Sequence, residues 1–212
     1  MPLAQRLFLV LLAVTISATG RSQVKNLTPL SPTLKLQTLT FSFGAGIPQS
    51  RQGITAFWDA GPSGSMKFMV NVSKPVALGI GLDAAMLKFN EGAFRLSHPT
   101  VPVQSKDILL TNVYLAMKYS IMPSMRLSPY VGVTIGASHL SEAVYGDVID
   151  SVRVSYYNIP GRTRLSLGIS FGADVYLARW LACDIEAKTN YMHNDPDIGM
   201  ASFLRGGLRF TL

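Results

Sequence analysis

Hydrophobic and polar residues alternate strictly along most of this chain. The stretch RLSLGISFGADVY, residues 164–176, places large apolar residues on one parity and glycine, serine or aspartate on the other. This two-residue period predicts a β-strand with two unlike faces, because successive side chains of a strand point to opposite sides. Seven more stretches repeat the pattern, so we expect eight strands and no helix between them. The other stretches are residues 39–47, 65–73, 76–86, 111–119, 129–138, 180–191 and 202–212.

The connections between these strands alternate in length. Lys74-Pro75, residues 120–127 and residues 177–179 are short enough for hairpin turns, whereas the other connections are mostly long. The long ones are residues 48–64, 90–106 and 140–162, with a shorter one at 193–196. In an up-and-down order of strands, all tight turns then lie at one end, together with both termini, and the long loops lie at the other end.

Two interpretations fit the alternation, and they place opposite faces towards water. In a soluble secreted carrier of the lipocalin type the apolar rows point inward, whereas in a membrane barrel they face lipid. The strand glycines favour the membrane barrel, because glycine weakens a strand and is useful only where a narrow interior has no room for side chains. The glycines on the polar face are Gly44, Gly46, Gly79, Gly81, Gly132, Gly136, Gly168, Gly172 and Gly207.

Aromatic residues support the same interpretation. Four large ones share the parity of the glycines and are expected to fill the interior, namely Tyr114, Tyr130, Tyr176 and Phe203. Four others stand near the ends of the apolar rows, where an interfacial girdle is expected, namely Tyr119, Trp180, Tyr191 and Phe210. We therefore predict an eight-stranded antiparallel up-and-down transmembrane β-barrel, in which the first strand pairs with the eighth because lipid leaves no strand edge satisfied.

The N-terminus has the features of a cleavable signal peptide. Arg6 precedes an apolar run of about ten residues, and small residues lead to a plausible cleavage point before Arg21. We expect a signal peptide over residues 1–20, a periplasmic lead-in over 21–38 and the barrel over 39–212.

Composition excludes several other classes. Only 15% of residues are charged, and no apolar stretch in the body of the chain reaches the length of a membrane-spanning helix. The net charge of +7 comes from scattered Lys and Arg without a basic run, so we expect no nucleic-acid partner. The single cysteine, Cys183, has no ligand-spaced neighbour. We expect no disulfide, no metal, no cofactor and a monomer.

The interior parity also carries charges of both signs. Asp184, Glu186 and Lys188 lie on the seventh predicted strand, and Arg205 and Arg209 lie on the eighth. Buried charges are costly unless paired, so we expect a structural charge network with cross-strand ion pairs and no sizeable conductance. Lys67, Asp83, Lys118 and Asp174 share the interior parity on other strands.

One set of residues suggests an enzyme as an alternative. His139 and Ser141 lie two apart at the long-loop end of the fifth strand, on the outward face. If Tyr119 pairs with Leu127, Asp107 lies opposite His139, which would complete a Ser–His–acid set. This H-x-S spacing resembles lipid A deacylases of the PagL type, although the glutamate of that family has no counterpart at the start of the sixth strand. The resemblance implies an outer-membrane lipid A-modifying hydrolase.

The long loops hold two further candidates. Asp195-Pro196-Asp197 is interpreted as a turn rather than a calcium site. Four aromatic residues in the loops could contact a partner at the surface, namely Trp58, Tyr145, Tyr156 and Tyr157.

As a whole, the chain resembles the small outer-membrane β-barrels, both the OmpA- and OmpX-like proteins and the PorT-like domain. The resemblance rests on the pattern, on PYVGVTIGAS after a tight turn, and on the final GGLRFTL, in which Phe210 rather than the terminal Leu212 is aromatic. It implies a Gram-negative outer membrane and a structural or surface-interaction role through the long loops. The implied partners are outer-membrane lipid and lipopolysaccharide, the outer-membrane assembly machinery and a surface partner.

Overall fold

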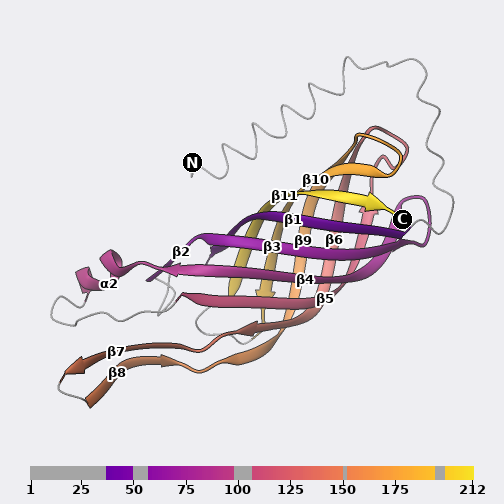
Figure 1. Ribbon diagram of the computed structural model, residues 1–212. Coiled ribbons are helices and arrows are strands. Elements are labelled where there is room, and N and C mark those ends of the chain that lie inside the picture. The colour runs from indigo at the N-terminus through magenta and orange to yellow at the C-terminus, as the bar shows by residue number, and fades with distance from the viewer. Residues whose placement is uncertain (1–36, 50–56, 98–106, 150–151, 194–198) are drawn as a thin grey trace. The chain divides into compact units, whose positions relative to one another are not determined.

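A computed structural model describes residues 37–49, 57–97, 107–149, 152–193 and 199–212, and for residues 143–159 only the backbone (Figure 1). The elements are β1 (Gln37–Pro48), β2 (Trp58–Asp59), β3 (Gly61–Asn71), β4 (Val76–Phe89), α2 (Glu91–Ser97), β5 (Ile108–Ser120), β6 (Leu127–Leu140), β7 (Ala143–Ile149), β8 (Val152–Ile159), β9 (Arg162–Tyr176), β10 (Leu181–Met192) and β11 (Met200–Thr211). The predicted signal peptide and most of the lead-in lie outside the described residues. β1 begins two residues before the predicted barrel boundary.

Eight of these strands close into an antiparallel barrel, as predicted. The order around the barrel is β1, β3, β4, β5, β6, β9, β10 and β11, and β11 returns to β1. The closing pair aligns Leu39 with Phe210 and Gly44 with Arg205. Because every strand has two neighbours, the barrel backbone has no free edge, which is the condition for crossing a hydrocarbon layer with strands.

The two ends of the barrel differ as the connection lengths predict. The β3–β4, β5–β6 and β9–β10 turns lie at one end, which we call the short-turn end. Both chain ends of the barrel lie there too, since the Leu212 amide donates to the Gln37 carbonyl at 2.8 Å. The opposite end, the long-loop end, carries β2, α2 and the β7–β8 hairpin.

Three predicted loops contain regular structure. The connection over 48–64 contains the two-residue strand β2 and the first residues of β3. The connection over 140–162 contains the β7–β8 hairpin. This two-stranded sheet lies between β6 and β9 in the sequence and is separate from the barrel sheet. The connection over 90–106 begins with the short helix α2, which corrects the expectation of no helix. The Asn90 side chain caps α2 by accepting from the Ala93 amide at 2.8 Å. Within the described residues, no helix has the length and apolar character needed to span a membrane.

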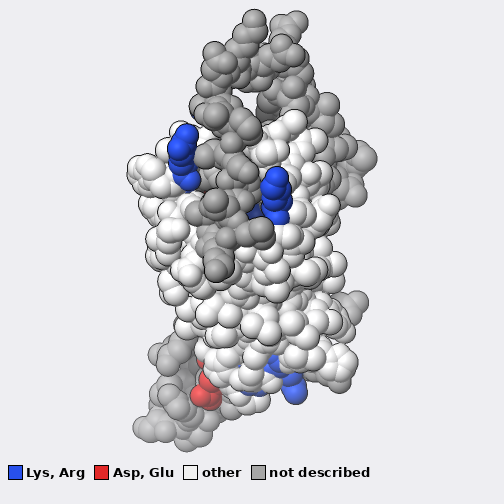
Figure 2. Space-filling view, turned by 90° about the vertical axis from the view of Figure 1, so that its right-hand side faces the viewer, with Lys and Arg blue, Asp and Glu red and all other residues white. Residues whose placement is uncertain are grey.

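The outer surface of the barrel is apolar, which decides between the two sequence interpretations. On β9, Leu167, Ile169 and Phe171 are 49%, 56% and 54% exposed. Gly172 faces inward, since a Cβ added there would lie 2.5 Å from the Tyr130 ring. On the face shown in Figure 2, the described charged side chains lie towards the two ends and leave a broad uncharged zone between them. A soluble carrier of the lipocalin type is therefore excluded.

Aromatic residues lie at the rims of this apolar surface. Tyr119 and Trp180 are 48% and 58% exposed at the short-turn end, where Trp180 stacks on Phe210 with a centroid distance of 6.5 Å. Tyr191 is 48% exposed near the long-loop end. These positions match the interfacial girdle predicted from the sequence.

Candidate functional site

The lumen is filled in layers, and the layer at the long-loop end is apolar. Trp58, Leu87 and Phe203 are each at most 3% exposed and belong to one buried cluster. The other buried members are Ala85, Ile108, Leu110, Leu140, Met192 and Ala201. Phe94 of α2 is 2% exposed and packs against Phe57 and Phe89 beside this cluster. We call this layer the apolar plug.

On the side of the plug that faces the short-turn end, Asp83 is the centre of the first charged group. Its two carboxylate oxygens accept from Lys188 Nζ at 2.8 Å and from Arg205 Nη1 at 2.6 Å. The Tyr114 hydroxyl donates to the same carboxylate at 2.9 Å, and Lys188 Nζ lies 3.4 Å from the centroid of the Tyr114 ring. Asp83 is 1% exposed and Arg205 is 2% exposed, so this is a fully buried cluster.

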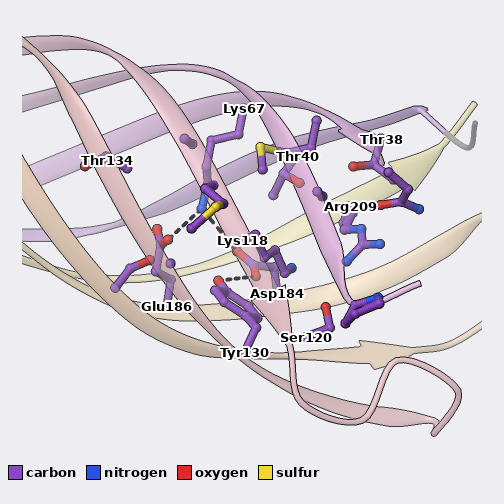
Figure 3. A pocket seen from close by; sticks show the side chains of 18 of the residues that line it. Thr38, Thr40, Lys67, Lys118, Ser120, Tyr130, Thr134, Asp184, Glu186 and Arg209 are labelled. Atoms are coloured by element: carbon purple, nitrogen blue, oxygen red, sulfur yellow. Dashed lines mark hydrogen bonds and ion pairs between the residues drawn. The ribbon is translucent and has the colours of Figure 1, made fainter. Parts of the chain in front are cut away.

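The second charged group contains both acidic residues of β10. Glu186 accepts from Lys67 Nζ at 2.8 Å, and the same ammonium lies 4.0 Å from Asp184. The Tyr130 hydroxyl donates to Asp184 at 2.8 Å. Figure 3 shows Lys67 and Tyr130 reaching these carboxylates from opposite walls of the lumen.

The third charged group surrounds Asp174. Its Oδ2 accepts from Lys118 Nζ at 2.6 Å and from the Arg209 guanidinium. Arg209 also donates to the Tyr176 hydroxyl at 3.1 Å. The Lys118 ammonium lies 3.7 Å from the centroid of the Tyr130 ring, which links this group to the second one.

The structure brings all five predicted network residues into the lumen but pairs them differently from the prediction. Glu186 lies directly opposite Arg205 in the β10–β11 register, yet Glu186 pairs with Lys67 and Arg205 pairs with Asp83. The predicted β10–β11 ion pairs are therefore wrong. In a narrow barrel the long side chains reach across the axis, so they find partners on strands that are not their neighbours.

At the short-turn end the lumen contains a small polar cavity of about 40 Å³. Lys67, Lys118, Arg209 and Glu186 line it, together with smaller residues such as Thr134 (Figure 3). A cavity of this size holds a few water molecules. Asp184 Oδ2, Glu186 Oε2 and Arg209 Nε are buried without a hydrogen-bond partner among the described protein groups, so water in the cavity would satisfy them.

The structure does not assemble the predicted catalytic set. His139 pairs with Thr111 and not with Asp107, so the expected β5–β6 register is wrong by four residues. The His139 ring bonds Thr163 Oγ1 at 3.0 Å. Ser141 Oγ accepts from the Leu109 amide at 3.0 Å, and Asp107 accepts from the Phe89 amide at 3.2 Å. Each of the three side chains thus bonds a different partner.

The loop candidates are only partly within the described structure. Trp58 was expected on the surface, but it is 3% exposed and belongs to the apolar plug. The backbone of Tyr145, Tyr156 and Tyr157 lies in the β7–β8 hairpin, while their side chains and residues 195–197 lie outside the described part. Among the described residues, no group of His, Cys, Asp and Glu has the arrangement of a metal site.

Known structures share this architecture. No protein-family model matches the chain, and no curated protein matches its sequence. Neisserial surface protein A matches 84% of this chain and 97% of its own length, with 13% identity and a TM-score of 0.57. OprG, an outer membrane protein of Pseudomonas aeruginosa, matches 87% of this chain and all of its own, with 10% identity and a TM-score of 0.57. Ail, the attachment invasion locus protein of Yersinia pestis, matches 84% of this chain and 97% of its own, with 12% identity and a TM-score of 0.51.

Fold and surface together define the class. The chain has the closed eight-stranded fold of these proteins. It also has the apolar outer face and the polar lumen that a hydrocarbon layer requires of such a barrel. The chain is therefore a small membrane-spanning β-barrel with the fold of these outer-membrane proteins.

Proposed function

We propose that this protein is a non-porin barrel of the OmpA- and OmpX-like or PorT-like kind, which acts structurally and through its long-loop end. The single observation that carries the proposal is the filled lumen. The apolar plug closes one end, and paired charges occupy the space between the plug and the short-turn cavity. An eight-stranded barrel has an interior only wide enough for its own side chains, so transport of solutes is disfavoured.

The long-loop end offers the surface for interaction. The β7–β8 hairpin and α2 extend from a rigid barrel, and binding residues are disproportionately found on such extensions. One protein with this fold, Ail, is by name an attachment and invasion protein. The proposed partners are outer-membrane lipid and lipopolysaccharide around the barrel, the assembly machinery at the C-terminal strand β11, and a surface partner at the loops of a monomer.

No observation favours the hydrolase as a second function. Catalysis of this type needs the nucleophile, the base and the acid within hydrogen-bond reach of one another. His139 and Ser141 instead bond Thr163 and the Leu109 amide, and Asp107 bonds the Phe89 amide.

Electrical recording in planar bilayers tests the sealed lumen. Purified full-length protein, shown to be folded by heat-modifiable migration in gels, is expected to give no discrete channel events. A porin with about 16 strands, added at the same concentration, serves as the positive control because its lumen is wide. Regular conductance steps from the folded barrel would contradict the proposal.

Removal of the hairpin tests the surface role. A variant in which a short Gly/Ser turn replaces residues 143–159 should fold as the parent does, because the β7–β8 sheet is separate from the barrel sheet. Bacteria that display the full chain should adhere to host-cell layers, and bacteria that display the variant should lose that adherence. Equal adherence of both, at equal surface amounts, would show that the hairpin is not the interaction surface.

A further inference from the structure

Two turns at the short-turn end expose large apolar side chains where tight turns ordinarily carry small polar residues. In the β5–β6 turn Ile121 is 54% exposed, Met122 39% and Met125 54%. In the β9–β10 turn Leu177 is 53% and Trp180 58% exposed. The remaining tight turn, residues 72–75 between β3 and β4, exposes a single large apolar side chain, Val72 at 55%. We call the five exposed side chains of the other two turns the turn patch.

The two turns of the patch are neighbours in space. β6 pairs with β9, and beyond the last pair the Tyr176 amide donates to the Arg126 carbonyl at 2.9 Å. The Arg126 side chain makes a second hydrogen bond between the same two residues, in which its Nε donates to the Tyr176 carbonyl at 3.3 Å. The β9–β10 turn is held to the barrel by the Thr211 amide, which donates to the Trp180 carbonyl at 2.9 Å. The patch is therefore one surface on a fixed backbone.

The charge at this surface is positive. Arg126 and Arg179 are both exposed, and neither turn contains an acidic residue. Within the described residues, the Nη atoms of Arg126 donate to no protein group, so they are available to an anion. Arginine binds a phosphate oxygen pair with its planar fork of donors.

The position of the patch identifies its occupant. Tyr119, which directly precedes the β5–β6 turn, belongs to the outward apolar face that lipid covers, and Trp180 belongs to the aromatic rim. Apolar side chains continuous with this face, bordered by arginines, match a lipid whose acyl chains are buried and whose headgroup is anionic. We infer that the turn patch, with Arg126 and Arg179, is a binding site for an anionic phospholipid of the leaflet at the short-turn end.

Native mass spectrometry of the full-length barrel in detergent tests this site, with phosphatidylglycerol and phosphatidylcholine as probes. The parent should retain phosphatidylglycerol in preference to phosphatidylcholine. R126Q/R179Q should reduce that retention about tenfold, because each cation near an anionic lipid surface contributes a separable attraction. K74Q, a charge removed from the turn outside the patch, should leave retention unchanged. M122S/M125S, which keeps both arginines but removes apolar contacts with the acyl chains, should also weaken retention of phosphatidylglycerol.

Several results would overturn the inference. Equal retention of both lipids, or unchanged retention in R126Q/R179Q, would show that the site does not select an anionic headgroup. Displacement of the lipid by inorganic phosphate alone would indicate a site for free phosphate, and retention of neither lipid would leave the patch to a protein partner. If a variant does not fold, brominated lipids in vesicles replace it. Brominated phosphatidylglycerol should quench the emission of Trp180 more strongly than brominated phosphatidylcholine at the same mole fraction, and the other tryptophan, Trp58, is buried in the apolar plug. Equal quenching by the two lipids would contradict the site.

Discussion

At the scale of single residues, the lumen depends as much on absent side chains as on present ones. A Cβ at Gly172 would lie 2.5 Å from Tyr130 Cζ and 2.4 Å from the Ile185 carbonyl oxygen. A Cβ at Gly81 would lie 2.4 Å from Tyr114 Cζ. These two glycines make room for the two tyrosine rings that carry the interior hydrogen bonds to Asp83 and Asp184.

Substitution of Gly172 by alanine should therefore destabilise the barrel. We expect a loss of about 1–3 kcal/mol, the usual cost of overpacking a filled interior, in the free energy of unfolding measured with urea in lipid vesicles. Gly206 is the matched control, because nothing lies within 4 Å of its added Cβ. Gly206→Ala should be neutral or stabilise by up to about 1 kcal/mol, since alanine restricts the unfolded chain. Similar effects at both positions would contradict the role assigned to Gly172.

Asp83 is the residue whose neutralisation should cost most. Asp83→Asn would leave Lys188 and Arg205 buried opposite an uncharged group, and removal of one partner from a buried ion pair costs about 3–5 kcal/mol. The same urea titration measures this loss. Asp83→Asn combined with Lys188→Met should be less destabilised than Asp83→Asn alone, because one uncompensated cation is then absent. Glu91→Gln, which breaks the exposed Glu91–Arg95 pair on α2, should cost less than about 1 kcal/mol.

At the scale of elements, the sequence predicts which face of each strand points inward but not how far one strand is shifted along the next. A shift by one residue would turn every apolar side chain into the lumen, so parity is strongly specified. A shift by an even number keeps all faces correct. The predicted pairing of Tyr119 with Leu127 and the observed pairing with Val131 differ in this way, and the pattern cannot distinguish them.

The error in the candidate catalytic set follows from this even shift. The true partner of His139 is Thr111. Asp107 precedes β5 and lies four residues before Thr111, a separation of about 13 Å along an extended strand. Trp58 illustrates a second limit. Trp58 lies in β2, just before β3 in the sequence, and it is buried because β2 pairs with the last residues of β4, where Trp58 lies opposite Phe89. No local pattern around residue 58 predicts that contact.

At the scale of the whole molecule, the lumen has a dry half and a wet half. The apolar plug excludes water at the long-loop end, while the cavity at the short-turn end contacts charged groups with unsatisfied oxygens. The sequence predicts the charges inside but not this division, because both halves are built from the same inward parity. The division arises from which strands extend furthest towards the loops and bring Leu87, Ile108 and Leu140 together.

Two positions on one strand measure this division. Thr134 and Ser138 lie four residues apart on the inward face of β6; Thr134 lines the cavity, whereas Ser138 is 2% exposed and donates to Asn112 at 3.2 Å. In a Cys183→Ser background, Thr134→Cys in the folded barrel should react within minutes with hydrogen peroxide, a reagent small enough to enter a cavity that holds only a few water molecules. Ser138→Cys should react only after unfolding by heat, since water does not reach it. Mass spectrometry counts the oxygen atoms added to the introduced cysteine, and equal oxidation of the two folded variants would mean that water crosses the whole lumen, which would also remove the physical basis for a sealed barrel.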